Sequence, residues 1–470
     1  MSLSNFLYSR LLEYLQYEPT EGQAQLFRQL SVFISEQSSE NIFIVRGYAG
    51  TGKTTSVAAL VRLLEELKIN IVLLAPTGRA AKVLATYTGK PAFTIHKKIY
   101  RQKSLNDGIG TFVLNHNEHQ NTVFIVDEAS MIANRAEQTI FGTGNLLDDL
   151  VDYVKAGKYC KLLLIGDDAQ LPPIGFSQSP ALDMREMENY GVAGKTQLRD
   201  VVRQAAKSGI LYNATLLRKN IEHAIFEIPK LSVKKFPDIE AITGGEVMEK
   251  LSEAYAHYGE RETIVVCRSN KRANRYNQGI RAKIQYREEQ LTAGDRLMVV
   301  KNCYQFLETV ENIDFIANGD IVDLMRIRKY EERYGLHFAE AVLSFPDYGE
   351  VEITSKIMLD TLLSETSSLS SEQQRQLFFN VSDDYAHITN KRKRYNHVRE
   401  DLFYNALQIK YAAAVTCHKA QGGQWKAVFI DYPFFGNAPI TIDDLRWLYT
   451  AFTRATEKLY LVNFDEKLLG

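Results

Sequence analysis

The sequence predicts an α/β protein with two domains, each built around a parallel sheet that helices cover on both faces. Short, mostly apolar runs alternate with helical stretches, which is typical of parallel strands buried on both sides. This alternation occurs twice, first at 42–166 and again from residue 263 onward. The chain has 470 residues. At roughly 150 residues per domain, that length favours about three domains over one small fold.

The first domain is expected at 1–200. Its predicted strands are four to six residues long and rich in β-branched and aliphatic residues, and a helical pattern separates each strand from the next. Because continuous apolar runs of this length are typical of strands in the centre of a parallel sheet, we expect both faces of this sheet to be buried. The strands are expected at 42–45, 69–74, 123–126 and 161–165.

The second domain is expected at 201–293 and 407–470, with a β-rich insert and a polar extension at 294–406 between the two pieces. Its strands are expected at 263–267, 427–431 and 458–462, with a helix at 443–453. The insert has strand patterns at 296–301, 321–327 and 338–343. The extension at 360–406 contains the basic run 391–394. Such a run is more often a solvated helix face than a nucleic-acid contact, and both interpretations stay open.

Composition and charge describe an ordinary globular chain. Hydrophobic residues make up 45% and charged residues 24%, which gives enough apolar surface to offset the entropy lost on ordering. Lys and Arg total 56, Asp and Glu total 57, and the net charge is −1. Any binding of nucleic acid must therefore come from a local groove and not from the field of the whole molecule.

Neither a membrane span nor an export signal is expected. The longest apolar runs are far shorter than the about 18 to 20 residues that cross a bilayer. The N-terminus shows apolar residues at helical spacing and no basic region followed by an apolar block. The four cysteines have no CxxC spacing, so we expect packing residues and no disulfide or zinc site. These features predict a cytoplasmic protein.

A phosphate-binding loop is expected between the first strand and the first long helix. Residues 47–54 read GYAGTGKT and match the pattern G-x-x-x-x-G-K-[ST] in the strand-to-helix context that it requires. Glycines let backbone N–H groups and the helix N-terminus face the phosphates. Lys53 would reach the β- and γ-phosphates, and Thr54 would hold Mg²⁺. The alternative is an ordinary Gly-rich turn. The nucleotide contacts expected here are Gly47, Gly50, Thr51, Gly52, Lys53, Thr54 and Thr55.

Two later strands end in polar side chains at the sheet edge where α/β proteins bind ligands. Asp127 and Glu128 follow one strand. Asp127 would hold Mg²⁺ through water, and Glu128 would orient and deprotonate the attacking water. An acidic pair alone is most often a capping feature. Gln170 follows the next strand and would hydrogen-bond the γ-phosphate; the alternative there is a loop that ends in prolines.

The order of these motifs resembles that of superfamily-one helicases of the RecD, Dda and Pif branch. Nine ordered motifs carry the resemblance, which covers nearly the whole chain. The matches in the first domain are Thr20 with Gln23, the loop 47–54, APTGRAAK at 75–82, TIH at 94–96, DEAS at 127–130 and GDDAQLPP at 166–173. The matches in the second domain are VRQ at 202–204, VTCHKAQG at 415–422 and YTAFTRA at 449–455.

The resemblance implies a fold of two RecA-like P-loop NTPase domains with parallel sheets, a β-hairpin insert and a small SH3-like β-barrel insert. The barrel would lie at about 294–352, and the hairpin at about 97–121 would act as a wedge with a turn at 106–108. Phe112 would stack on the base pair being split. A surface hairpin that merely buries Phe112 fits nearly as well.

The resemblance also implies roles for single residues. Gln23 would read adenine, Gly422 would contact the nucleotide, and Arg203 and Arg454 would stabilise the γ-phosphate charge from the second domain. The residues expected to hold DNA phosphates are Thr77, Arg79, Lys82, His96, Thr416 and His418. Each of these fits a helix cap or a buried hydrogen bond about equally well. Gln424 stands where the branch commonly has Glu.

These roles imply a DNA helicase that uses ATP and Mg²⁺, moves 5′-to-3′ on single-stranded DNA and unwinds duplex at a fork. Work in DNA repair, recombination or replication would follow from that activity. A nuclease or a single-strand-binding protein would be a further partner. One alternative is the helicase subunit of an ATP-dependent exodeoxyribonuclease complex. The other is a nucleic-acid-stimulated ATPase switch that does not unwind.

Overall fold

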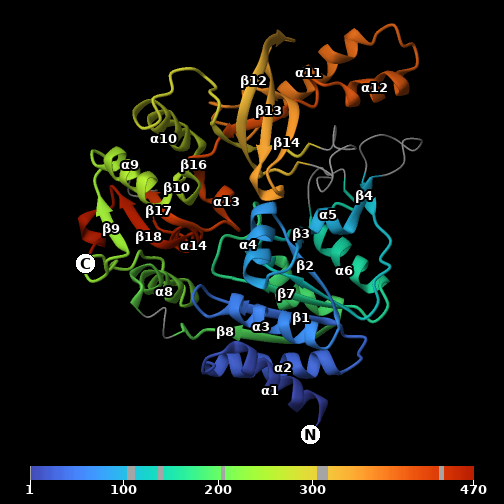
Figure 1. The fold of residues 1–470 in the computed structure, drawn as a ribbon, viewed down its shortest axis with the longest axis vertical. Helices are drawn as coiled ribbons and strands as arrows, with labels where there is room; N and C mark the ends of the chain where they lie inside the picture. Colours follow the sequence, from blue (N-terminus) through green and yellow to red (C-terminus); the bar gives the residue numbers. More distant parts are fainter. Residues whose placement is uncertain (1, 103–111, 136–140, 203–206, 304–315, 433–438) are drawn as a thin grey trace.

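Two parallel sheets and one closed barrel form the frame of the molecule (Figure 1). The structure is a computed structural model that describes residues 2–102, 112–135, 141–202, 207–303, 316–432 and 439–470. The two sheets, each covered by helices, and the small barrel confirm the predicted fold class. None of the helices in the described ranges has the length and apolar character needed to cross a membrane. All four cysteines are buried as thiols.

The first sheet has six parallel strands in the order β3-β2-β6-β7-β1-β8. They are β1 (Ile42–Gly47), β2 (Asn70–Ala75), β3 (Ala92–Thr94), β6 (Thr122–Val126), β7 (Lys161–Gly166) and β8 (Val192–Leu198). The four predicted strands are confirmed as β1, β2, β6 and β7. Because β1 pairs with β7 on one side and with the edge strand β8 on the other, the loop that follows β1 leaves the carboxyl end of the sheet one strand in from its edge.

Helices cover both faces of this sheet, and the alternation of side chains along β1 explains why. Phe43 and Val45 pack on one face with α1, α2 and α3, whereas Ile42 and Ile44 pack on the other face with α5 and α6. The helices of this domain are α1 (Leu3–Leu15), α2 (Glu21–Ser35), α3 (Lys53–Glu66), α4 (Gly78–Thr88), α5 (Ile95–Ile99), α6 (Leu146–Ala156) and the short α7 (Met184–Met187).

The predicted hairpin insert begins and ends as an antiparallel strand pair. β4 (Tyr100–Gln102) pairs with β5 (Phe112–Leu114), so that Gln102 faces Phe112. The predicted turn at 106–108 lies outside the described residues.

The second sheet has five parallel strands in the order β16-β10-β17-β18-β9. Its strands are β9 (Ile239–Ile242), β10 (Thr263–Cys267), β16 (Ala414–Thr416), β17 (Trp425–Asp431) and β18 (Ala455–Val462). Its helices are α8 (Gly209–Glu222), α9 (Val247–Tyr258), α10 (Asn270–Lys283), α13 (Cys417–Ala420) and α14 (Ile442–Phe452). The predicted strands β10, β17 and β18 and the predicted helix α14 are confirmed.

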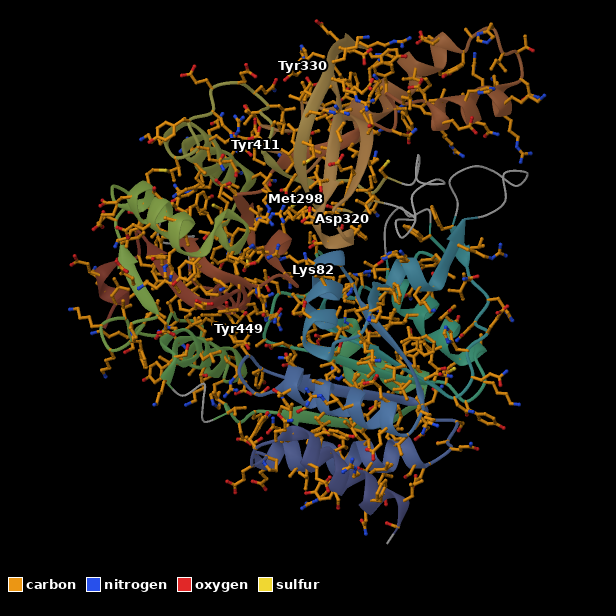
Figure 2. The ribbon with its side chains drawn as sticks, viewed as in Figure 1. Lys82, Met298, Asp320, Tyr330, Tyr411 and Tyr449 are labelled. Atoms are coloured by element: carbon orange, nitrogen blue, oxygen red, sulfur yellow. The ribbon has the colours of Figure 1, made fainter. Side chains whose placement is uncertain are left out.

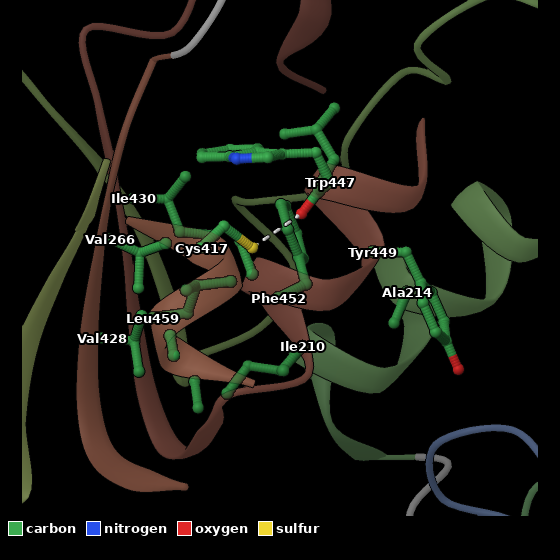
Figure 3. Packing of buried hydrophobic residues seen from close by; sticks show 14 of the residues in the cluster. Ile210, Ala214, Val266, Cys417, Val428, Ile430, Trp447, Tyr449, Phe452 and Leu459 are labelled. Atoms are coloured by element: carbon green, nitrogen blue, oxygen red, sulfur yellow. Dashed lines mark hydrogen bonds between the residues drawn. The ribbon is translucent and has the colours of Figure 1, made fainter. Parts of the chain in front are cut away.

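The core of the second domain continues into the first domain. Trp447 and Phe452 of α14 pack on the sheet, and the Cys417 thiol donates to the Trp447 carbonyl oxygen at 3.5 Å (Figure 3). The same buried cluster includes Tyr48 and Leu171 of the first domain. The two domains therefore share one continuous apolar core.

The barrel is closed by five strands and carries a helical hairpin. The strands are β11 (Arg296–Val299), β12 (Ile321–Arg333), β13 (Leu336–Phe345), β14 (Val351–Met358) and β15 (Leu407–Tyr411). Strand β15 lies in the stretch that the sequence assigns to the second domain, but it pairs with β11 and β14. Its sequence LQIKY alternates apolar and polar residues, unlike the continuous apolar runs of the parallel strands, and this alternation is the signal that could have separated it from the second sheet. Helices α11 (Ser371–Asp384) and α12 (Lys391–Glu400) project from the barrel between β14 and β15.

One end of the barrel rests on α4 of the first domain. Figure 2 shows Asp320 and Lys82 at this junction. The Tyr348 hydroxyl donates to the Asp320 carboxylate at 3.2 Å, and Lys82 Nζ lies 3.0 Å from Asp347 Oδ1. A Cβ built on Gly78, the first residue of α4, would lie 3.0 Å from both Asp320 Oδ1 and Tyr348 Oη. Because the contact is this close, burial raises the pKa of Asp320 to about 7.

This raised pKa predicts a pH dependence of stability. The usual pKa of an aspartate carboxyl is 3.8. Between pH 3.8 and about pH 7, the folded state therefore holds a proton on Asp320 that the unfolded chain has released. Stability therefore falls as pH rises through this window, by up to about 1.4 kcal/mol per pH unit. We expect Asp320→Asn to remove this contribution, so its thermal unfolding midpoint should change less between about pH 5 and pH 7 than that of the wild type. Equal pH slopes in both proteins would contradict the assignment.

Candidate functional site

The P-loop, residues 47–54, connects β1 to α3 in a shape that fits a chain of phosphates. Gly50 and Gly52 have φ angles of 74° and 81°, a left-handed conformation that favours glycine. A Cβ on Gly47 would lie 2.8 Å from Cγ of Lys53. No side chain caps the first turn of α3, so its N-terminal N–H groups remain available to an anion.

Lys53 is held inside the loop. Its Nζ donates to the carbonyl oxygens of Gly47 and Tyr48 and lies 3.9 Å from Asp167 Oδ2. The buried Thr51 hydroxyl donates to the Tyr48 carbonyl at 2.7 Å and so fixes the shape of the loop. The ammonium group is therefore positioned where phosphate oxygens would replace backbone carbonyls as its partners. Thr54 and Thr55 are exposed.

The predicted acidic pair lies next to this loop. Asp127 accepts hydrogen bonds from the Tyr87 hydroxyl at 2.6 Å and from the Glu128 amide at 2.9 Å. Glu128 has a φ of 51°, an uncommon conformation for a residue with a side chain. Burial raises the pKa of the Glu128 carboxyl, and the positive charge of Arg454 opposes this rise. A carboxyl with a raised pKa is better suited to accept a proton near neutral pH.

Arg454 brings the second domain to the same place. Its side chain is 2% exposed and donates to the carbonyl oxygens of Thr450 at 3.1 Å and Gly423 at 3.0 Å. Among the charged groups that act on Glu128, Arg454 has the largest effect, ahead of Asp127 and Lys53. The charge of Arg454 thus acts on Glu128 across the domain boundary, while its hydrogen bonds to Thr450 and Gly423 stay within the second domain. Arg203 lies outside the described residues.

Tyr449 joins the two domains at the P-loop, although sequence reasoning gave it no role. Its buried hydroxyl donates to Asp167 Oδ2 at 2.6 Å and accepts from the Ala49 amide at 2.8 Å. Figure 2 labels this side chain, which comes from α14 of the second domain. It belongs to the motif at 449–455, in which only Arg454 is assigned a role from the sequence. A buried tyrosine beside a predicted nucleotide contact is the signal that could have found it.

Two further hydrogen bonds cross the same boundary. The Leu171 amide donates to the Thr450 hydroxyl at 2.9 Å, and Gln421 Nε2 donates to the Leu171 carbonyl at 2.6 Å. Leu171 follows Gln170 in the predicted γ-phosphate segment. Both backbone polar groups of Leu171, which lies in the segment after β7, are therefore hydrogen-bonded to the second domain.

The two predicted glutamines lie on either side of the P-loop. Gln23 forms a capping box with Thr20 at the start of α2, and a Cβ on Gly52 would lie 2.3 Å from its Nε2. The Gln23 amide thus contacts the loop directly. Gln170 Oε1 is buried and has no hydrogen-bond partner among the described residues. It lines a cavity of about 260 Å³ together with Arg46 and Asp168.

The predicted DNA contacts on α4 are engaged within the protein. The Thr77 hydroxyl caps the helix by accepting from the Ala80 amide at 3.2 Å. The Arg79 guanidinium lies 4.0 Å from the centre of the Trp425 ring and donates to the Gln424 carbonyl at 2.9 Å. Burial lowers the pKa of Arg79 to about 10. Thr77 therefore stabilises the start of α4, and Arg79 links α4 to the second domain. Contact of either residue with DNA stays a prediction.

Thr416 and His418 line a cavity of about 350 Å³ between the second sheet and the barrel. Sequence reasoning missed the cations beside them, Arg268, Lys410 and Lys419, which line the same cavity. Burial lowers the pKa of Lys410 and of Lys419 to about 8. Neither lysine has a carboxylate at ion-pair distance in the part of the chain that the structure describes. Half-buried cations of this kind fit a bound anion.

His96 and Phe112 lie in an aromatic cluster at the base of the hairpin. The His96 ring is 4.8 Å from that of Phe141 and 5.7 Å from that of Tyr100. Burial lowers the pKa of His96 to about 4, so the ring is neutral. Phe112 is 7% exposed and packs at 4.7 Å on Phe141. A contact of either ring with DNA stays a prediction.

Comparison with known proteins adds to this geometry. Residues 19–228 match the family described as an AAA domain, and residues 411–462 match the UvrD-like helicase C-terminal domain. The ATP-dependent RecD2 DNA helicase of Deinococcus radiodurans is 30% identical over 199 residues, which cover 42% of this chain and 24% of that protein. The chain therefore contains an AAA domain and a UvrD-like helicase C-terminal domain, and over part of its length it is similar to a RecD2 helicase.

Two more proteins are similar to this chain. The ATP-dependent DNA helicase Dda of Enterobacteria phage T4 is 28% identical over 168 residues, 33% of each chain. A crystal structure of Pif1 helicase from Bacteroides in complex with ADP-AlF3 and single-stranded DNA has a TM-score of 0.45 at 14% identity, covering 97% of this chain and 95% of that one. The chain thus spans about a quarter of RecD2 and a third of Dda.

Gln424 stands at the position where the resemblance leads us to expect Glu. Its carbonyl accepts from Arg79, and it lines a cavity of about 450 Å³ with Thr54 and Tyr87. Beside it, Gly422 has a φ of 71°, and a Cβ there would lie 3.1 Å from the Thr77 hydroxyl. This segment of the second domain therefore contacts Thr77 and Arg79 at the start of α4 and lines a cavity that reaches Thr54.

The Tyr449 bridge leads to a prediction about the P-loop. Tyr449→Phe leaves the buried Asp167 carboxylate and the Ala49 amide without a shared partner, a loss of about 1–3 kcal/mol. We expect the Ala49 amide to exchange its hydrogen at least about tenfold faster than in the wild type, as measured by hydrogen–deuterium exchange. The control is Tyr460→Phe in β18, whose ring stacks on Phe429 far from the P-loop. Equal exchange at Ala49 in both variants would contradict a role for this hydroxyl.

Proposed function

We propose that the chain is an ATP-driven motor that moves 5′-to-3′ along single-stranded DNA and unwinds duplex at a fork. The observation that carries the proposal is the interdomain contact of Tyr449 with Ala49 and Asp167 at the P-loop, five residues before Arg454, whose charge acts on Glu128. A site shared by two domains can convert a change in its occupant into a change in their relative position. The motor would comprise residues 1–200, 201–293 and the C-terminal stretch after the barrel.

ATP is the substrate that fits this site. The glycine turn and the uncapped start of α3 would hold the phosphates, while Gln23 beside Gly52 would contact the base. Bound Mg²⁺ would neutralise phosphate charge during transfer. Thr54 and Asp127 would hold that ion, and Asp127 is already oriented by Tyr87. Gln170, with its unpartnered Oε1, would orient a group at the γ-phosphate.

Hydrolysis would depend on Glu128, Lys53 and Arg454. Glu128, whose pKa is raised by burial, would accept the proton of the attacking water. Lys53 and Arg454 would stabilise the charge that spreads over the transferring phosphoryl group, because a guanidinium fork offers fixed donors to several oxygens. Loss of the γ-phosphate would weaken the attraction of Arg454 toward the first domain and favour opening.

The same contacts would carry the change to DNA. Arg454 donates to the Gly423 carbonyl, Gly422 abuts Thr77, and the Gln424 carbonyl accepts from Arg79. A shift of this segment would therefore move the start of α4 relative to Thr416 and His418. Hydroxyl and cationic side chains at both places suit sequence-independent binding of phosphates. RecD2 and Dda are named DNA helicases, which supports DNA as the partner.

A strand-displacement assay tests the proposal. We expect the wild type to unwind duplexes with a 5′ tail and to hydrolyse ATP much faster with single-stranded DNA. Lys53→Ala should lower turnover by about 10²- to 10³-fold or more, since it removes a charge that stabilises the transition state. Lys155→Ala, an exposed lysine on α6, is the matched control and should behave as the wild type.

Other results would contradict parts of the proposal. A preference for 3′ tails would overturn the polarity, and substantial ATPase in Lys53→Ala would show that the nucleotide binds elsewhere. Stimulated ATPase without strand separation would favour the switch alternative. Unwinding only in the presence of a copurified nuclease would favour the exodeoxyribonuclease alternative.

A further inference from the structure

Helix α12 carries a concentration of positive charge that the motor does not use. Five of its ten residues are Lys or Arg, and Glu400 is its only carboxylate. The chain as a whole has a net charge of −1. Residues 391–394 read KRKR and form the first turn of the helix. Lys391, Arg392 and Lys393 are exposed, and Arg394 is partly so.

This arrangement costs the folded protein stability. The N-terminus of a helix carries partial positive charge, so cations in the first turn are repelled, and they also repel one another. The first turn of α12 contains no acidic residue. In the described ranges none of these four side chains lies within ion-pair distance of a carboxylate. A repulsive cluster with no internal counter-charge would be neutralised by an external polyanion.

The helix is fixed firmly enough to present these charges. Val398 is its one buried residue and packs with Leu377 and Val381 of α11 on the barrel. The Tyr395 ring lies 5.2 Å from that of Phe378, also on α11. These contacts hold the α11–α12 hairpin against the barrel, while the cations point away from its small core. In Figure 1 the hairpin extends from the barrel on the side where β4 lies and away from the second sheet.

The shape of this surface favours duplex over single-stranded DNA. Proteins bind a single strand in a groove with stacking platforms, whereas α12 presents the outside of a helix. At 1.5 Å per residue it is about 15 Å long, a length of duplex axis that carries about nine phosphate charges. Arg392 and Arg399 are seven residues apart, so they share one face two turns apart. Residues 391–394 are consecutive and surround the first turn of the helix. This convex cluster of cations, with Arg399 two turns beyond Arg392, can contact phosphates on the outside of a duplex.

We propose that the basic first turn of α12, residues 391–394, binds the phosphate backbone of double-stranded DNA. This second site rests on the proposed function, which supplies a DNA fork, but it is separate from the cavity lined by Thr416 and His418. Its contacts are to phosphates and carry no sequence preference. It would keep the unseparated part of the fork on the barrel side of the motor while a single strand passes between the two domains.

The experiment compares two variants that each lose four positive charges. The first is K391A/R392A/K393A/R394A. The control is K155A/K158A/K234A/K235A, four exposed lysines elsewhere. Affinity for a blunt 20-base-pair duplex is measured by fluorescence anisotropy over a range of salt concentrations. In parallel, the ATPase of each variant is titrated with single-stranded DNA, and its thermal unfolding midpoint is measured.

We expect the α12 variant to bind duplex at least about tenfold more weakly than the control. The slope of its plot of log affinity against log salt concentration should be shallower by about 2 or more, since each lost phosphate contact reduces the slope by about 0.9. The single-stranded DNA needed for half-maximal ATPase should stay within about twofold of the wild type. The unfolding midpoint should equal or exceed that of the wild type, because alanine relieves repulsion in the first turn.

Three results would overturn the inference. Duplex affinity equal in the two variants would show that α12 does not bind DNA. An equal loss for duplex and for single-stranded DNA would show a site for the single strand. A lower unfolding midpoint with unchanged duplex affinity would show a structural role. Failure of the proposed function is distinct, because the wild type itself would then show no ATPase response to single-stranded DNA.

Discussion

The structure depends on a buried contact between two parallel-sheet domains at the P-loop. Tyr449 enters this contact from α14 and places one hydroxyl between the Ala49 amide and the Asp167 carboxylate. A hydroxyl buried this deeply is stable only when both partners are in place. Five residues later along the same motif stands Arg454, which acts on Glu128. One interdomain contact therefore positions the charge on which hydrolysis would depend.

The barrel adds a second constraint on the same site. Lys82 of α4 is paired with Asp347, and Lys419 donates to Asn318, so the barrel end lies on both elements that are predicted to hold DNA. Both contacts place an oxygen of the protein where a phosphate oxygen would bind a lysine. A DNA strand that enters would compete with them. The position of the barrel and the occupancy of the DNA path are thus linked through the same side chains.

Much of the frame could be predicted because its determinants are local. A short apolar run such as 161–165, bounded by turn residues, favours a strand buried on both faces, and glycines at positions 50 and 52 are required by positive φ angles. Residues 407–411 were placed in the second domain without a predicted strand, whereas in the structure they pair with β11 and β14 as β15 of the barrel. The contacts of Arg79 with Trp425 and of Lys82 with Asp347 join residues more than 250 positions apart. Spacing along a chain carries no information about such pairs.

The central claim is that Arg454 acts on a nucleotide held by the other domain. Single-turnover hydrolysis of saturating ATP by Arg454→Lys, with single-stranded DNA present, measures this most directly. The variant keeps the positive charge but loses the planar fork. The account predicts a hydrolysis rate about 10³-fold below that of the wild type, with ATP affinity changed by no more than a few-fold. A rate equal to that of the wild type, or a loss explained entirely by weaker ATP binding, would contradict it.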